Sequence, residues 1–439
     1  MSIMKKSFII NLSAGLMLTG VLASCNKEIG SLNGSSVDDV SANPSRLELN
    51  NMVVGSEAGM RTQIGLYLDA VGVLGREVYR FSGAEPRYTT ELLGKNDLTL
   101  TNNVFYLSNP WNARYRVVKN CNIIIAGATR STLITDKQEK GYTGFAKTIK
   151  AYQLLLNLNY TETNGIRVDV ADPDKLGPFL SYDQSLTEIA KLLDEGKTEI
   201  AEGEALYVLS GGFDNKGGGM LKFNRAIAAR VAAYRKDWPG VLSALSESFF
   251  NLDGDFADGF YHVFSTGPND QTNPSYFRPN NTGEARLTHP SFITDLTAYS
   301  AADDRKNKAR LRTAAESSDD LTGTHDLALF ASNTSPMAII RQEELILLYA
   351  EAKANLDEIT DAKTAIDKIR TKHGGVAYAG DDTKEALITE NLLQRRFSLL
   401  YEGHRWIDLR RYGRLAELPL DRTNDTVFER MPKPLTEAQ

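Results

Sequence analysis

Apolar residues recur at every third or fourth position through much of the chain, which is the spacing of one face of an α-helix. This periodicity predicts helices over residues 111–128, 142–160 and 184–203. Residues 160–183, between the second and third of these helices, contain Gly and Pro and are expected to form a loop. The pattern as a whole favours a mainly α-helical fold.

Two further stretches each predict a pair of helices joined by a short turn. Apolar residues at helical spacing mark these pairs over 223–234 with 238–249 and over 345–356 with 362–369. Asp237 and Thr360 precede the second helix of each pair and are expected to cap it, because their side-chain oxygens can accept from free backbone N–H groups. Each pair has about the length of the tetratricopeptide unit, which is about 34 residues. Such units bury their apolar faces by stacking, so we expect a scaffold of stacked tetratricopeptide-like helix pairs.

The helical pattern is interrupted over residues 251–338, which are rich in Gly, Pro, Asn, Asp and Thr with interleaved Tyr and Phe. Residues 51–108 contain a second irregular piece. A loop region of this length is usually functional or disordered, and its aromatic residues argue against disorder. We expect a single helical domain over residues 45–439, with a long irregular, loop-rich insertion at about 251–338.

The beginning of the chain predicts export and a lipid anchor. Lys5 and Lys6 precede an apolar stretch that is too short for a comfortable membrane span, so residues 1–24 are expected to be a signal peptide. This segment ends in Leu-Ala-Ser before Cys25, which resembles the bacterial lipobox, where the cysteine receives acyl chains such as palmitate. Two or more chains anchor a protein stably. Residues 25–44 are rich in Ser, Gly, Asn and Asp and are expected to form a flexible tether.

Composition and charge narrow the possible partners. The chain has 42% hydrophobic and 24% charged residues, which is ordinary for a globular protein with a core. Its formal net charge of −6 becomes −8 without residues 1–24, which contain two lysines and no acid. An acidic chain argues against a nucleic-acid partner, because phosphates require a basic surface. The second cysteine, Cys121, lies in the apolar stretch VVKNCNIII and is expected to be a buried thiol.

The sequence shows no catalytic or metal-binding motif. The five histidines are scattered and none belongs to a zinc-binding pattern. Gly196-Lys197-Thr198 matches the end of a phosphate-binding loop, but Lys191 stands where that motif requires glycine. We therefore expect no enzymatic activity, no cofactor and no metal site. A surface hydrolase remains an alternative, because the paired carboxylates of a glycosidase need no local motif.

Two segments near the C-terminus carry a family resemblance. They read RQEELILLYAEAKANL (341–356) and LLQRRFSLLYEGHRWIDLRRYGRL (392–415). Together with the lipobox, the helix pairs and GFYHVFSTGPNDQTNP (259–274), they resemble a shorter-chain branch of the SusD/RagB family of nutrient-uptake lipoproteins. The resemblance implies a tetratricopeptide-based helical protein that is lipid-anchored in the outer membrane and exposed at the cell surface.

The same resemblance implies a function. Family members cover a SusC-type TonB-dependent porin and bind a glycan or a peptide before import. We therefore expect a lipoprotein that binds a nutrient, with a glycan favoured, and delivers it to such a porin. Peptide binding and a helical scaffold that grips a partner protein remain alternatives. The chain is short for the family, which puts the family's ligand-binding loops in question.

Ligand contacts are expected on loops, because the apolar residues of the predicted helices are used in packing. Sugars present C–H faces that aromatic rings cover and hydroxyl groups that Arg and Asn bind. Two loops combine these side chains. Their candidate ligand-binding residues are Arg87, Tyr88, Tyr276, Phe277 and Arg278.

The Arg-Trp-Ile-Asp-Leu-Arg-Arg run near the C-terminus is expected to be structural. Trp406 follows a long apolar helix and is expected to be buried in the core. Arg405 or Arg411 is expected to pair with Glu402 or Asp408.

Overall fold

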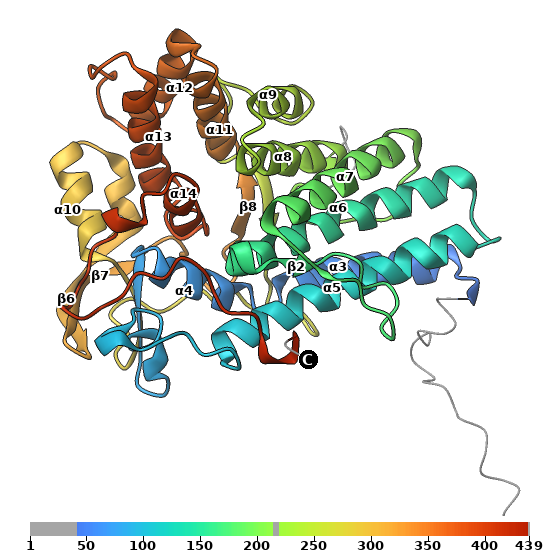
Figure 1. Ribbon diagram of the computed structural model, residues 1–439, viewed down its shortest axis with the longest axis horizontal. Helices are drawn as coiled ribbons and strands as arrows, with labels where there is room; N and C mark the ends of the chain where they lie inside the picture. The colour runs from blue at the N-terminus through green and yellow to red at the C-terminus, as the bar shows by residue number, and fades with distance from the viewer. Residues whose placement is uncertain (1–41, 214–218, 438–439) are drawn as a thin grey trace, which may run out of the picture.

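The computed structural model describes residues 42–213 and 219–437, and most of them are helical (Figure 1). The expected mainly α-helical fold is thereby confirmed. Cys25 and the signal peptide over residues 1–24 lie outside the described residues, so both stay predictions.

Long helices stack side by side through the N-terminal half of the chain (Figure 1). They are α3 (Arg46–Arg61), α5 (Phe105–Arg130), α6 (Asp136–Thr161) and α7 (Tyr182–Glu202). The three helices expected from the apolar period are confirmed. α6 and α7 begin earlier than their apolar residues suggest, because Thr135 and Ser181 each form a capping box with a Gln side chain. Cys121 is fully buried in α5, as expected.

Glycine allows α6 and α7 to approach closely. A Cβ atom at Gly144 would lie 2.7 Å from the Ile200 side chain, and one at Gly196 would lie 2.8 Å from the Thr148 hydroxyl oxygen. The Gly-Lys-Thr triplet that begins at Gly196 is thus part of a packed helix, as its position in the apolar pattern indicates.

Two helix pairs continue the stack. They are α8 (Gly219–Tyr234) with α9 (Trp238–Ser246) and α11 (Gln342–Asn355) with α12 (Ile359–Lys372). The expected cap of α9 is confirmed, since the Asp237 carboxylate accepts from the backbone N–H of Gly240 at 3.0 Å. The expected cap of α12 is wrong. This helix begins directly after Glu358, so Thr360 already lies in its first turn.

Four further α-helices complete the α-helical part of the described residues. They are α4 (Ile64–Leu74), α10 (Pro290–Tyr299), α13 (Lys384–Ser398) and α14 (Arg405–Arg411). Trp406 is fully buried, which confirms its expected place in the core. Arg411 pairs with Asp408 at 2.9 Å, as expected. Arg405 pairs with neither expected acid, because Glu402 is held by Arg341 and Asp408 by Arg395 and Arg411.

The two irregular stretches meet in one antiparallel sheet, which the apolar pattern did not predict. Its strands, in spatial order, are β1 (Val78–Ser82), β5 (Glu284–Thr288), β7 (Leu321–Leu327) and β6 (Ala309–Ser318). A second pair joins β4 (Gly259–His262) to β8 (Met337–Arg341), and a third joins β2 (Ile166–Arg167) to β3 (Phe179–Leu180) within the expected loop. The sheet brings chain segments about 200 residues apart to one place, as the pairing of Arg80 with Arg286 shows.

Buried side chains form one large core that runs from α3 to Met431 and a smaller one between α11, α12 and α13. Over residues 42–213 and 219–437, no helix has the length and apolar character that crossing a membrane requires.

Candidate ligand-binding site

An open cavity of about 540 Å³ lies where the first turn of α4 meets β1, β5 and two loops. Tyr88, from the short 3₁₀ turn Pro86–Tyr88, and Phe277, from the loop before β5, both line it. Besides Asp69 and Thr62, its polar and aromatic lining includes three arginines, three amides and one more ring. These are Arg61, Arg80, Arg286, Gln63, Asn109, Gln271 and Phe105.

A buried carboxylate organises the floor of the cavity. Both oxygens of Asp69 accept hydrogen bonds from the Arg286 guanidinium, at 2.6 and 2.7 Å. The hydroxyl of Tyr401 donates to the same carboxylate at 2.7 Å. Burial by itself would raise the pKa of Asp69, but the Arg286 guanidinium outweighs it, so this pKa lies below its usual value. Asp69 therefore remains ionised, with its oxygens engaged, and is a structural anchor.

Two arginines face each other across the strands β1 and β5. Arg80 and Arg286 are direct cross-strand partners, and like charges in this position repel. Asp69 lies between them, 3.5 Å from Arg80 Nε, and Glu284 accepts from the other side of Arg80. The pairing with acids makes this juxtaposition stable and holds both guanidinium planes in place.

Aromatic rings cover these guanidinium groups. The Arg80 carbon Cζ lies 5.1 Å from the ring centre of Tyr88 and 4.7 Å from that of Phe277. The Arg286 Cζ lies 4.4 Å from the same Phe277 ring. Cation–π contacts of this kind are worth about 0.5–2 kcal/mol each. They fix the orientation of two rings beside the open cavity, so a ligand meets preformed flat surfaces.

Backbone strain occurs at two residues of this region. Gln63, which precedes α4 and lines the cavity, has φ +58°, and Tyr401, which contacts Asp69, has φ +61°. Left-handed backbone at a non-glycine residue costs on the order of 1 kcal/mol or more and accumulates at functional sites. The strain places a side-chain amide at the cavity and a phenol hydroxyl on the buried carboxylate.

One group of possible metal ligands occurs among the described residues, and it lies elsewhere. It consists of Asp303, Asp304 and His373. Asp303 is already bound by Arg305, and the His373 ring contacts Asp304 on one side and Glu343 on the other. Asp303 and the His373 ring are thus engaged by protein partners, and the group forms an ion-pair network.

Comparison with known proteins gives a family match in the C-terminal part of the chain. The model of the SusD family matches residues 317–438, which include both C-terminal segments of the resemblance. The fold over the rest of the chain matches solved SusD-superfamily structures. The resemblance to the SusD/RagB family is thereby confirmed for the C-terminal part of the chain. No curated protein matches the chain by sequence.

Solved structures resemble this chain over most of its length. A surface glycan-binding protein A from Bacteroides thetaiotaomicron, in complex with laminarihexaose, has 16% identity and a TM-score of 0.66, covering 90% of this chain and 97% of that one. A SusD superfamily protein from Parabacteroides distasonis has 15% identity and a TM-score of 0.67, covering 92% and 97%. A SusD-like carbohydrate binding protein from Bacteroides vulgatus has 16% identity and a TM-score of 0.64, covering 84% and 83%. These TM-scores establish a common fold.

The structure separates the five ligand-binding candidates. Tyr88 and Phe277 share one cavity. Arg87 lies beside it, paired with Glu85 and placed over the Phe105 ring at 5.0 Å. Tyr276 and Arg278 are not among the residues that line it.

The cavity also contains residues that the sequence analysis missed. Asp69, Arg80 and Arg286 are its charged floor. Asp69 and Arg80 are each the only charged residue in the segments IGLYLDAVGVL and VYRFS, while Arg286 shares the strand EARLT with Glu284. Buried charges are paired, so these isolated charges are a signal that could have located the site.

Proposed function

We propose that this protein binds an oligosaccharide in the cavity between α4 and β1. The observation that carries the proposal is the placement of the Tyr88 and Phe277 rings against fixed guanidinium groups in one open cavity. Rings cover the C–H faces of a sugar, while the Gln63, Asn109 and Gln271 amides can bind its hydroxyl groups. A structural relative is named as a glycan-binding protein in complex with laminarihexaose, which supports the same ligand class.

The charges of the cavity favour a neutral ligand. Each arginine of the cavity is paired with an acid. Arg80 and Arg286 share Asp69, Arg80 also pairs with Glu284, and Arg61 pairs with Asp270. A ligand therefore meets hydrogen-bond donors and rings with little uncompensated charge. A protein that passes its ligand on should bind weakly, and a Kd of about 1 mM to 1 μM corresponds to about −4 to −8 kcal/mol. Two rings and a few hydrogen bonds supply this amount.

The proposal includes the cellular setting. Lipidation at Cys25 would anchor the chain in the outer membrane, and the segment before Ser45, the N-cap of α3, would serve as the tether. A SusC-type TonB-dependent porin would receive the ligand. The match of residues 317–438 to the SusD family supports this arrangement, and co-purification of the detergent-extracted lipoprotein with such a porin tests it.

Phe277→Ala is expected to weaken oligosaccharide binding about tenfold, which is about 1.4 kcal/mol, because it removes the ring that covers Arg80 and Arg286. Calorimetric titration of residues 26–439 with laminarihexaose and a panel of other neutral oligosaccharides measures the effect. Tyr276→Ala is the matched control, since Tyr276 adjoins Phe277 in the chain but does not line the cavity.

Equal binding by wild type and Phe277→Ala would place the ligand elsewhere. Binding of peptides and of no oligosaccharide in the panel would favour the peptide-binding alternative. The bound oligosaccharide is expected to be recovered intact, because both oxygens of Asp69 are engaged by Arg286. Shortened products in proportion to protein concentration would favour the hydrolase alternative.

Cys25→Ala is expected to move the protein from the membrane fraction to the soluble fraction, because it removes the residue that would carry the acyl chains. Fractionation with fatty-acid labelling measures this result. Cys121→Ala is the matched control, since that thiol is buried and its pKa is raised to about 12 by burial. Retention of label and membrane association in Cys25→Ala would contradict the anchor.

A further inference from the structure

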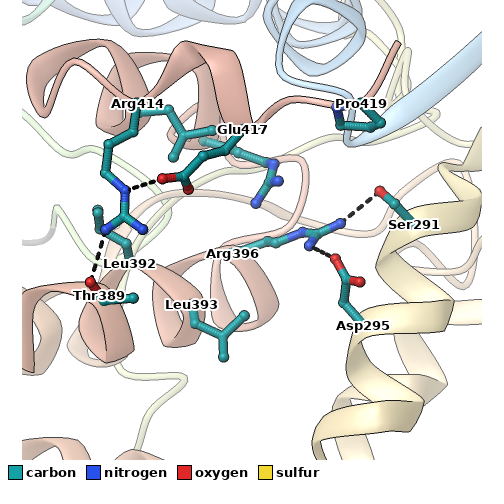
Figure 2. A pocket seen from close by; sticks show the side chains of 11 residues that line it. Ser291, Asp295, Thr389, Leu392, Leu393, Arg396, Arg414, Glu417 and Pro419 are labelled. Atoms are coloured by element: carbon teal, nitrogen blue, oxygen red, sulfur yellow. Dashed lines mark hydrogen bonds and ion pairs between the residues drawn. The ribbon is translucent and has the colours of Figure 1, made fainter. Parts of the chain in front are cut away.

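A second cavity, of about 440 Å³, lies between α10, α13 and the chain that follows α14 (Figure 2). It shares no lining residue with the first cavity. Its volume lies within the range of about 300–1,000 Å³ that small-molecule sites occupy. It can thus be considered independently of the proposed oligosaccharide site.

Three arginines line this second cavity. Arg396 forms an ion pair with Asp295 and donates a hydrogen bond to the Ser291 hydroxyl (Figure 2). Arg414 donates hydrogen bonds to the Glu417 carboxylate and to the Thr389 hydroxyl (Figure 2). The third is Arg405. The lining thus contains three guanidinium groups and two carboxylates, in a chain whose formal net charge is −6. An anion would balance the remaining positive charge.

Arg405 is the one of these three arginines that forms no ion pair with a described residue. Its Nε donates to the backbone oxygen of Gly75 at 3.1 Å, and it forms no ion pair with any residue that the structure describes. Its two terminal nitrogens have no hydrogen-bond partner among the described residues and are not fully buried, so they face accessible space in the cavity. Arg405 can therefore offer free N–H donors to a bound oxyanion.

The surroundings strengthen this positive site. Burial and the nearby Arg396 guanidinium lower the pKa of Arg405, and burial raises the pKa of the neighbouring Glu77 carboxyl. The nearby acids Glu77, Asp295 and Glu417 raise the pKa of Arg405 but do not outweigh burial and Arg396. A bound anion would relieve the repulsion between the arginines, and this relief is a source of binding free energy.

The rest of the lining has the character of a saccharide site. Leu392, Leu393, Leu409 and Pro419 form apolar walls, and Ser291 and Thr389 add hydroxyl groups. A bare inorganic ion would leave most of this volume and the apolar walls uncovered. We propose that the second cavity binds an acidic sugar unit, with its carboxylate or sulfate group on Arg405 and its ring against the leucine walls.

Calorimetric titration with D-glucuronate, D-glucose 6-sulfate, D-glucose and acetate at equal ionic strength tests the proposal. D-glucuronate or D-glucose 6-sulfate is expected to bind, and comparison of the two identifies the anionic group that the site accepts. Acetate is expected to bind at least about tenfold more weakly, because it covers no apolar wall. D-glucose is also expected to bind at least about tenfold more weakly, because it lacks the charge that strengthens hydrogen bonds to Arg.

Variants locate the binding. Arg405→Gln is expected to weaken binding of the acidic sugar at least about tenfold, and Arg405→Lys, which keeps the charge, is expected to retain part of it. Arg414→Gln removes a partly exposed donor of the rim and is expected to weaken binding even if Arg405→Gln folds poorly. Arg116→Gln, on the exposed face of α5, removes the same charge far from the cavity in sequence and should bind as wild type.

Three results would overturn the proposal. In the first, Arg405→Gln and Arg414→Gln both bind the acidic sugar as tightly as the wild type does. In the second, D-glucose binds as tightly as D-glucuronate. In the third, acetate binds as tightly as D-glucuronate. Phe277→Ala should leave the acidic-sugar titration unchanged. Failure of the oligosaccharide site is therefore distinguishable from failure of this one.

Discussion

Replacing Trp406 by alanine is expected to lower the free energy of unfolding by about 3–5 kcal/mol, because this change leaves a large cavity in a packed core. The side chain is fully buried, and its indole Nε1 donates to the backbone oxygen of Phe428 at 2.8 Å. The Arg410 guanidinium lies 4.6 Å from the centre of the ring. One side chain thus joins α14 to the C-terminal segment, and its loss affects both.

Thermal and urea unfolding of residues 26–439 measure the change. Trp238→Ala is the matched control, since Trp238 is only half-buried at the start of α9 and should cost less. Trp406→Phe should recover part of the loss because it keeps an aromatic ring in the core. A Trp406→Ala variant with wild-type stability would contradict the structural role of this residue.

The sequence predicted the helices well because helix burial is periodic. In α5, Val117, Cys121 and Ile124 are spaced at three or four residues, and all are buried. The strands β1 and β5 escaped prediction because each has only five residues, and an alternation of polar and apolar residues this short does not stand out within an irregular stretch. Their pairing joins the two irregular stretches, and no local pattern encodes such a distant contact.

The candidate site could be predicted only in part, because the sequence shows residue types but not which of them meet in space. Tyr88 and Phe277 were singled out by residue type, as aromatic residues near arginine in irregular segments. Their meeting at one cavity depends on the sheet that brings Arg80 opposite Arg286. Arg87 was a poorer candidate because Glu85, two residues earlier, engages its guanidinium. The sequence thus indicates the chemical types, and the sheet decides which side chains share a cavity.

Replacing Glu344 by glutamine is expected to lower the free energy of unfolding by about 3–5 kcal/mol, because it leaves a buried charge uncompensated. Glu344 is fully buried and binds Arg230 through both oxygens, at 2.7 and 2.6 Å. The pair links α11 to α8, and Arg230 also donates to the backbone oxygen of Ile339 at 2.8 Å. Glutamine keeps the shape and removes only the charge.

Acid should weaken the same network in the wild type. Burial would raise the pKa of Glu344, but Arg230 outweighs burial and lowers it to about 2, below the ordinary value of 4.5. The stability from this group is thus present above pH 4.5 and is lost as the pH falls toward 2. The neighbouring His404 has a pKa lowered by burial to about 4 from 6.5, so the unfolded chain binds its proton first and stability already declines below pH 6.5.

Urea unfolding between pH 7 and pH 3 separates the charge of Glu344 from its packing. Glu344→Gln should be less stable at pH 7, and its stability should fall less steeply below pH 4.5, because it lacks the titrating carboxyl. Glu202→Gln, which breaks the exposed pair with Lys140, should change stability by less than about 1 kcal/mol. The double variant Arg230→Met with Glu344→Leu should recover much of the loss, because it removes both charges and keeps apolar volume. If Glu344→Gln were as stable as the wild type and its stability changed with pH in the same way, Arg230 and Glu344 would not form the buried pair that joins α8 to α11.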